Sequence, residues 1–104
     1  MVRRQHLSAI IYDKRGRIIS KGKNSYEKTH PIQAKFATKA GLPLKQTIHA
    51  EIDSIIRCDN PEKAHKIYIE REMRDGSKGL AKPCPICELA IKVMLPNLKI
   101  IEHT

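Results

Sequence analysis

The sequence is poor in aromatic residues and has no long apolar segment. Its 104 residues include no Trp, one Phe and three Tyr, so Ile, Leu, Val and Ala have to fill most of a core. No stretch approaches the ~18 apolar residues of a transmembrane helix. The basic start at Arg3 and Arg4 precedes an apolar run that is too short for a signal peptide. We therefore expect a cytoplasmic protein that has no membrane partner.

Cysteine and acidic residues are also scarce. Three cysteines, two of them close together, do not suit a disulfide framework. Asp and Glu number 11 against 20 Lys and Arg, which leaves a net charge of +9. This imbalance favours an anionic partner such as a nucleotide phosphate, a polynucleotide or an acidic surface, with a basic surface that has no special partner as the alternative. A chain of this length predicts one domain, residues 1–104.

Short apolar runs and turn residues predict a mixture of strands and helices. Residues 7–12 and 18–22 flank a turn that contains Gly, which predicts a β-hairpin. Four Ile residues within 48–56 form one apolar stripe of a helix. The remaining expected elements are a short helix at 33–39, a strand at 67–69, a loop at 73–82, a helix at 84–95 and a strand at 98–101.

The order of these elements indicates an α/β fold. Strands and helices alternate over the second half of the chain, which is typical of a sheet with parallel strand pairs and helices against its faces. We therefore expect a single α/β domain with a β-β-α-β-α-β core. In this arrangement a mixed sheet is sandwiched between helices, in three α/β/α layers.

Three residues have the types and spacing of metal ligands: His49, Cys84 and Cys87. The two cysteines lie three positions apart at a predicted helix start, so both sulfur atoms can reach one ion. A helix N-terminus lowers the pKa of a cysteine, and zinc binds the thiolate. Three protein ligands leave the fourth tetrahedral position for water, which is typical of a catalytic zinc site. Since His49 begins the other predicted helix, the sequence predicts a Zn²⁺ site where two helix N-termini converge.

Glu51 follows His49 by two residues and is the candidate proton carrier. At the first turn of a helix, both side chains can reach a point beyond the helix end. A carboxylate beside zinc-bound water can take a proton from the water and deliver it to a base and a departing amine. Taken alone, Glu51 is more typical of a solvated carboxylate that stabilises a helix start.

The Cys84–Cys87 pair by itself has two other interpretations. A structural zinc site needs a fourth protein ligand, and no further His or Cys stands in a second ligand-pair spacing. The candidates for that ligand are Cys58, His30 and His65. A redox pair is the other interpretation, because C-x-x-C at a helix start is also the thioredoxin-like pattern. The presence of His49 and Glu51 favours the catalytic metal site.

Two motifs, His49-Ala50-Glu51 and Pro83-Cys84-Pro85-Ile86-Cys87, resemble the H-x-E and P-C-x-x-C signature of the cytidine and deoxycytidylate deaminase superfamily. The resemblance extends to Gly22-Lys23-Asn24 after the second predicted strand, and the core of that family's fold covers the whole chain. Residues 25–31 look like compact members from phage and bacterial genomes. The family implies that His49, Cys84 and Cys87 bind Zn²⁺ and that Glu51 is the general acid and base. It also implies that the substrate contacts are Asn24, Ala50 and Pro83.

The resemblance implies a hydrolase that attacks C4 of cytosine and releases ammonia. The net charge favours a deoxycytidylate-type monophosphate among cytosine nucleosides and nucleotides. A base in single-stranded DNA or RNA is the first alternative substrate. A non-catalytic, zinc-stabilised binding protein that keeps the deaminase core is the second alternative.

Several further residues have two interpretations each. Candidate phosphate contacts, or merely solvated residues, are Lys35, Lys39 and Lys45. Residues 24–46 form a long connection that carries the short helix. We expect Tyr26 and Phe36 to pack this connection rather than to stack on a base. Many family members continue after the strand at 98–101 with another helix and strand, so substrate and subunit geometry stay open. A small core with truncated edges predicts a homo-oligomer.

Overall fold

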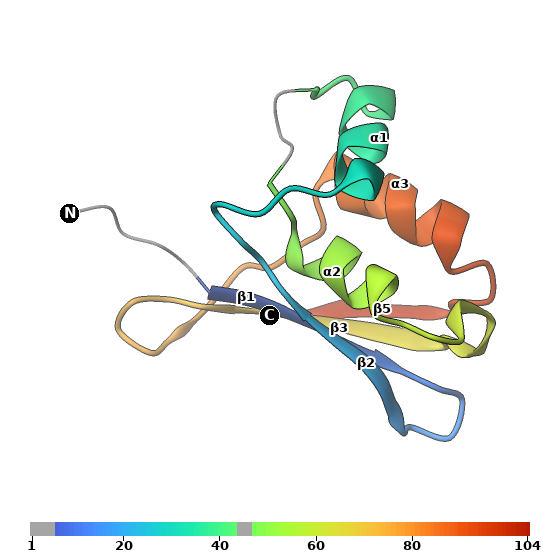
Figure 1. The fold of residues 1–104 in the computed structure, drawn as a ribbon. Coiled ribbons are helices and arrows are strands. Elements are labelled where there is room, and N and C mark those ends of the chain that lie inside the picture. Colours follow the sequence, from blue (N-terminus) through green and yellow to red (C-terminus); the bar gives the residue numbers. More distant parts are fainter. Residues whose placement is uncertain (1–5, 44–46) are drawn as a thin grey trace.

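The computed structural model describes residues 6–43 and 47–104, so Lys45 lies outside the described residues. The described chain forms strands, helices and one short 3₁₀ turn (Figure 1). In chain order these are β1 (His6–Tyr12), β2 (Ile18–Lys23), α1 (Pro31–Lys39), α2 (Ala50–Ile56), η1 (Pro61–Lys63), β3 (Lys66–Glu72), β4 (Lys78–Gly79), α3 (Pro85–Met94) and β5 (Ile100–His103).

The strands form one mixed sheet with β1 between β2 and β3. The pairs β1–β2, β1–β3 and β3–β4 are antiparallel, and β3–β5 is parallel. The strand β5 pairs with β3 from Lys66 to Ile69, and β4 pairs with Arg71 and Glu72 at the end of β3. The α/β class, the N-terminal hairpin and the parallel pair expected from the sequence are therefore confirmed.

All three helices lie on the same side of the sheet, with α2 directly against β1 and β2 and α1 packed against α3 (Figure 1). On that face Ala9 and Ile11 of β1 and Ile67 and Ile69 of β3 are fully buried. Their neighbours on the other face, such as Ile10, stay partly exposed. The expected three-layer sandwich is therefore wrong for the described residues, which build two layers. The reason is that β1 and β3 alternate in burial, whereas a sheet covered by helices on both faces has strands that are apolar on both sides.

The segment 73–82, expected to be a loop, contains the end of a second hairpin. The N–H of Met73 donates to the carbonyl of Ser77 at 2.8 Å, and Gly76 takes a φ of +87° in the turn. The chain then returns along the end of β3 as the two-residue strand β4. A strand of two residues is too short to show the alternation of apolar and polar residues from which strands are predicted.

The long connection after β2 carries α1, which begins two residues earlier than expected. His30 is its N-cap, and the Nδ1 atom of His30 accepts from the N–H of Ile32 at 3.1 Å. Pro31 occupies the first helical position, where its missing N–H leaves no donor unsatisfied. His30 is therefore a capping residue in this fold.

The core between helices and sheet is built mainly from Ile and Ala. Phe36 of α1, Ile52 of α2 and Ile86 of α3 are at most 1% exposed, so Phe36 packs as expected. Within 6–43 and 47–104, no helix combines the length and apolar character needed to cross a membrane.

The helix α2 lies directly on β2 at Gly22. A Cβ atom on Gly22 would stand 2.2 Å from the backbone nitrogen of Ser54 and 2.5 Å from the carbonyl oxygen of Ala50. Both atoms belong to the backbone of α2 and cannot rotate away. The absence of a side chain at Gly22 therefore sets the distance between this strand and the helix that follows His49.

We predict that Gly22→Ala lowers the free energy of unfolding by about 3 kcal/mol, the upper part of the range for overpacking, and weakens metal binding. The added methyl group has to push α2 away from β2. Chemical denaturation and metal titration measure the two effects. Gly16→Ala is the control: its Cβ meets nothing within 4 Å, although Gly16 has a φ of +80°. It should lose some stability and keep its metal affinity. Unchanged metal binding in Gly22→Ala would contradict the prediction.

Candidate metal centre

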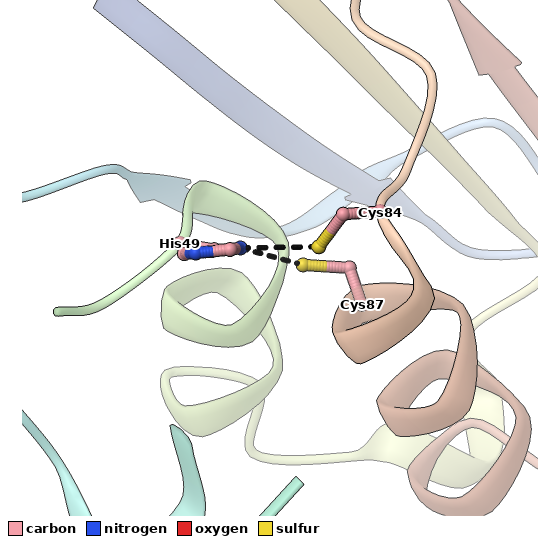
Figure 2. Close-up of side chains that lie close together, drawn as sticks. All are labelled: His49, Cys84 and Cys87. Atoms are coloured by element: carbon pink, nitrogen blue, oxygen red, sulfur yellow. Dashed lines mark hydrogen bonds between the residues drawn. The ribbon is translucent and has the colours of Figure 1, made fainter. Parts of the chain in front are cut away.

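The side chains of His49, Cys84 and Cys87 meet at one point (Figure 2). The Nδ1 atom of His49 lies 3.3 Å from the Sγ atom of Cys87 and 3.4 Å from the Sγ atom of Cys84. All three candidate ligand atoms lie within 4.8 Å of one another. The structure therefore brings together the three residues that the sequence predicted as ligands, in a group that can hold one metal ion.

Two helix starts position this cluster. His49 is the N-cap of α2 and Cys84 is the N-cap of α3, both with extended backbone conformations. Cys87 lies in the first turn of α3, one turn after Cys84, and Pro85 begins the helix between them. The N-terminus of α3 favours negative charge on both sulfur atoms, which is the ionisation state that binds a metal ion.

Gln33 of α1 supports the cluster from the third helix. Its side chain is fully buried, and its Oε1 atom accepts a hydrogen bond from the N–H of His49 at 3.2 Å. Gln33 begins the short helix expected at 33–39, and the sequence indicated no functional role for it. One signal could have identified Gln33 as a supporting residue. It is an uncharged polar residue on the same face of α1 as Phe36 and Ala37.

The described residues provide no fourth His, Cys, Asp or Glu ligand to this group. Cys58 is buried at the end of α2, and burial raises the pKa of its thiol. His30 caps α1, and the backbone of His65 bonds to Tyr12 and to the start of β5. The three residues considered as a closing ligand therefore have other places in the fold.

The two thiols of the cluster differ in acidity. A hydrogen bond from Cys87 and a further one from His49 lower the pKa of Cys84 to about 4, although partial burial acts the other way. The same hydrogen bond with Cys84, together with burial, raises the pKa of Cys87. A metal ion binds cysteine as the thiolate, so its binding to both sulfur atoms releases protons.

Glu51 is a buried carboxyl group beside the cluster. It is 5% exposed in the first turn of α2. Burial raises the pKa of Glu51, and hydrogen bonds from its own N–H and from the Cys87 thiol oppose this shift. A carboxyl group whose pKa is moved towards neutrality can accept a proton and release it again. The interpretation of Glu51 as a solvated carboxylate does not fit this burial.

A cavity of about 270 Å³ opens onto the cluster. Its lining consists of Leu7, Asn24, Ser25, Tyr26, Thr47, Ile48, His49, Ala50, Glu51, Arg71, Lys82 and Cys84. Two of the three expected substrate contacts, Asn24 and Ala50, are in this set, whereas Pro83 is buried and borders a different cavity, over α3 and β5. The Oδ1 atom of Asn24 accepts from the N–H of Leu7 at 3.0 Å, so this side chain also fixes the strand end.

The remaining sequence candidates divide between the cavity and the surface. Tyr26, expected to pack the long connection, is 47% exposed and borders the cavity. Lys35 and Lys39 are exposed on α1, with their ammonium groups 5.7 and 5.9 Å from the centre of the Phe36 ring. Neither lysine lines the cavity at the cluster. Two other cations, Arg71 and Lys82, do line it, although the sequence did not indicate them as candidates.

We predict that Cys84→Ala and Cys87→Ala each abolish the binding of one equivalent of metal at the cluster, because two ligands cannot hold the ion as three do. Elemental analysis after gel filtration measures the metal content, and circular dichroism checks the fold. Cys58→Ala is the matched control, since this cysteine lies outside the group. It should retain its metal, and metal loss in this variant alone would contradict the assignment.

We predict that Gln33→Leu lowers metal affinity by ~10-fold or more, the range seen when a group that orients a metal ligand is lost. It should also lower the free energy of unfolding by ~1–3 kcal/mol, because the N–H of His49 loses its buried acceptor. Competition with a chromogenic chelator measures the affinity. Thr38→Ala on the exposed side of α1 serves as the control. Wild-type affinity in Gln33→Leu would show that His49 needs no support from α1.

Comparison of the chain with models of known protein families and with curated protein sequences finds no match. The chemistry of this centre therefore has to be argued from its own geometry and from the two motifs that carry its residues.

Proposed function

We propose that this protein is a zinc-dependent hydrolytic deaminase acting on the cytosine base of a nucleoside or nucleotide. The observation that carries the proposal is the position of Glu51, a buried carboxyl group in the same cavity as His49 and Cys84. A closed structural metal site has no use for such a group. The pairing of a three-ligand cluster with an adjacent proton carrier is what hydrolytic chemistry at a metal centre requires.

The ligand set and its spacing support zinc as the ion. One imidazole and two thiolates are typical zinc ligands, with Zn–S near ~2.3 Å and Zn–N near ~2.1 Å. In a tetrahedral arrangement these bond lengths put nitrogen and sulfur ~3.6 Å apart. The distances of 3.3 and 3.4 Å from His49 to the two sulfur atoms lie close to that value.

The proposed reaction replaces the amino group on C4 of cytosine by oxygen. His49, Cys84 and Cys87 would hold the zinc ion, which would supply a nucleophilic water at neutral pH by lowering the pKa of that water. Glu51 would take one proton from the attacking water and deliver it to the ring nitrogen, and it would then carry the second proton of that water, from the oxygen now bonded to C4, to the departing amine. A C–O bond forms, the C4–N bond breaks, one water is consumed and ammonia leaves, so atoms balance. Asn24 and Ala50 border the space beside the ring.

A second candidate substrate is a cytosine within single-stranded DNA or RNA. A cavity of about 670 Å³ adjoins the metal cavity, and the two share Asn24, Ser25 and Ile48. The cationic residues of its lining are Lys21, Lys23, Lys28 and Arg57, against the single acid Asp53. A basic groove that continues from a deaminase site is suited to a polynucleotide backbone.

We predict that the zinc-loaded protein releases ammonia from at least one of cytidine, deoxycytidine, their monophosphates or a cytosine-containing oligonucleotide. Glu51→Gln should lower kcat by ~10²–10⁴-fold, the usual contribution of a general acid and base, with zinc content unchanged. Product identification by mass spectrometry measures the change from cytosine to uracil. Salt-dependent turnover of the oligonucleotide alone would favour the polynucleotide substrate.

The matched control is Glu88→Gln, which removes an exposed carboxylate from the first turn of α3. It should leave turnover unchanged, because Glu88 does not line the metal cavity. If Glu51→Gln turned over as fast as the wild-type protein, the proposed mechanism would be wrong. If no substrate of the panel yielded ammonia, the non-catalytic zinc-binding protein would be favoured.

A further inference from the structure

Arg71 is a cation on the face of β3 that is otherwise apolar and buried. Side chains alternate along a strand, so Arg71 shares the helix-covered face with Ile67 and Ile69, which are both 0% exposed. Glu70 and Glu72 fall on the opposite face of the sheet. Of the charged residues of β3, Arg71 alone therefore lies on the side of the metal centre, whereas Lys66, Glu70 and Glu72 lie on the other side.

The guanidinium group of Arg71 has a buried donor that the described residues leave unpaired. Its Nε atom has no hydrogen-bond partner among them. Buried polar groups are nearly always paired, because an unpaired one loses its hydration without compensation. Arg71 borders the same cavity as His49, Glu51 and Cys84. An acceptor within this cavity is therefore the partner that the geometry calls for.

The β3–β4 hairpin holds the stem of Arg71 in place. Gly79 pairs with Arg71 across the hairpin, and a Cβ atom on Gly79 would lie 2.9 Å from the Cδ atom of Arg71. The Oγ1 atom of Thr104 accepts from the N–H of Arg71 at 3.1 Å and donates to the carbonyl of Gly79 at 2.6 Å. Lys78 forms an ion pair with Glu70. The hairpin thus holds Arg71 in place. Glu70, one of the two carboxylates next to Arg71 in β3, is engaged by Lys78.

Lys82 is the second cation that borders the cavity, two residues before Cys84. Glu51 is the only carboxylate among the described residues of the lining, against the two cations Arg71 and Lys82. A guanidinium group presents a planar set of donors that matches two oxygen atoms of a phosphate, and a lysine adds a mobile point charge. The two side chains together have the chemistry of a phosphate site.

We propose that Arg71 and Lys82 form an anion subsite that binds the phosphate group of a nucleotide whose base reaches the metal cluster. The identity of the base rests on the proposed deaminase function, whereas the phosphate contacts follow from the two cations. The cavity volume of about 270 Å³ is close to the lower end of small-molecule sites, which favours a mononucleotide. A phosphodiester of an oligonucleotide offers the same chemistry, and the test separates the two sources.

The test compares ligands that differ only in the phosphate. Zinc-loaded Glu51→Gln protein, in which turnover is suppressed, is titrated with deoxycytidine, deoxycytidine 5′-monophosphate, a short cytosine oligonucleotide and inorganic phosphate by calorimetry. The monophosphate should bind at least ~10-fold more tightly than the nucleoside, as expected for charge-assisted hydrogen bonds. Adding Arg71→Gln should remove most of that difference and leave nucleoside binding within about 2-fold. Tighter binding of the oligonucleotide than of the monophosphate would identify the phosphodiester as the source.

Three further variants keep the result interpretable. Arg71→Lys retains the charge without the planar donors and should give an intermediate affinity, and Lys82→Gln should weaken phosphate binding without disturbing β3. Arg15→Gln removes the same charge from the exposed β1–β2 turn and should change nothing. If all variants kept the preference for the monophosphate, the subsite would be refuted while deamination could stand. If phosphate binding depended on Arg71 but no cytosine ligand bound, the subsite would stand and the proposed deaminase function would fail.

Discussion

The direct contact between α2 and β2 is the packing constraint on which the candidate site depends. Gly22 leaves no side chain between the strand and the helix backbone, and the buried hydroxyl of Ser20 donates to the carbonyl of Ser54 at 2.6 Å. The hydroxyl of Ser54 donates in turn to the carbonyl of Glu51, also at 2.6 Å. The first turn of α2 is therefore tied to the sheet through the hydroxyl groups of Ser20 and Ser54. This attachment fixes the positions of His49 and Glu51 relative to the sheet.

The metal centre needs all three helices, although only two of them carry ligands. The start of α3 supplies both sulfur atoms, and His49 is the N-cap of α2. The side chain of Gln33 in α1 accepts a hydrogen bond from the backbone N–H of His49. The sheet contributes Arg71 from the strand end that lies nearest to these helix starts. A cluster suited to a metal ion, a buried carboxyl group and two cations therefore border one small space. This combination favours a small anionic substrate that reacts with water.

Parts of the fold followed directly from local patterns. Two short apolar runs within residues 7–22 flank a turn that contains Gly, as in a hairpin, and the apolar stripes of α2 and α3 have the period of a helix. The number of layers could not be predicted from these local patterns, because it depends on which face of the sheet the helices cover. The strand β4 exists only through its pairing with the end of β3. The expected homo-oligomer stays a prediction, with Ile100 and Ile101 of β5 exposed at its edge.

The sequence by itself determined the ligand trio, because two cysteines one turn apart and a histidine at another helix start are recognisable from spacing alone. It also predicted a candidate role for Glu51, from its place in the first turn after His49 and from the resemblance of the motif His49-Ala50-Glu51 to the deaminase signature. Only the tertiary structure decided that Gln33 supports the cluster, that Arg71 borders the cavity and that Pro83 does not. These contacts join segments far apart in the chain. Their geometry arises from packing of helices on the sheet, which no local pattern encodes.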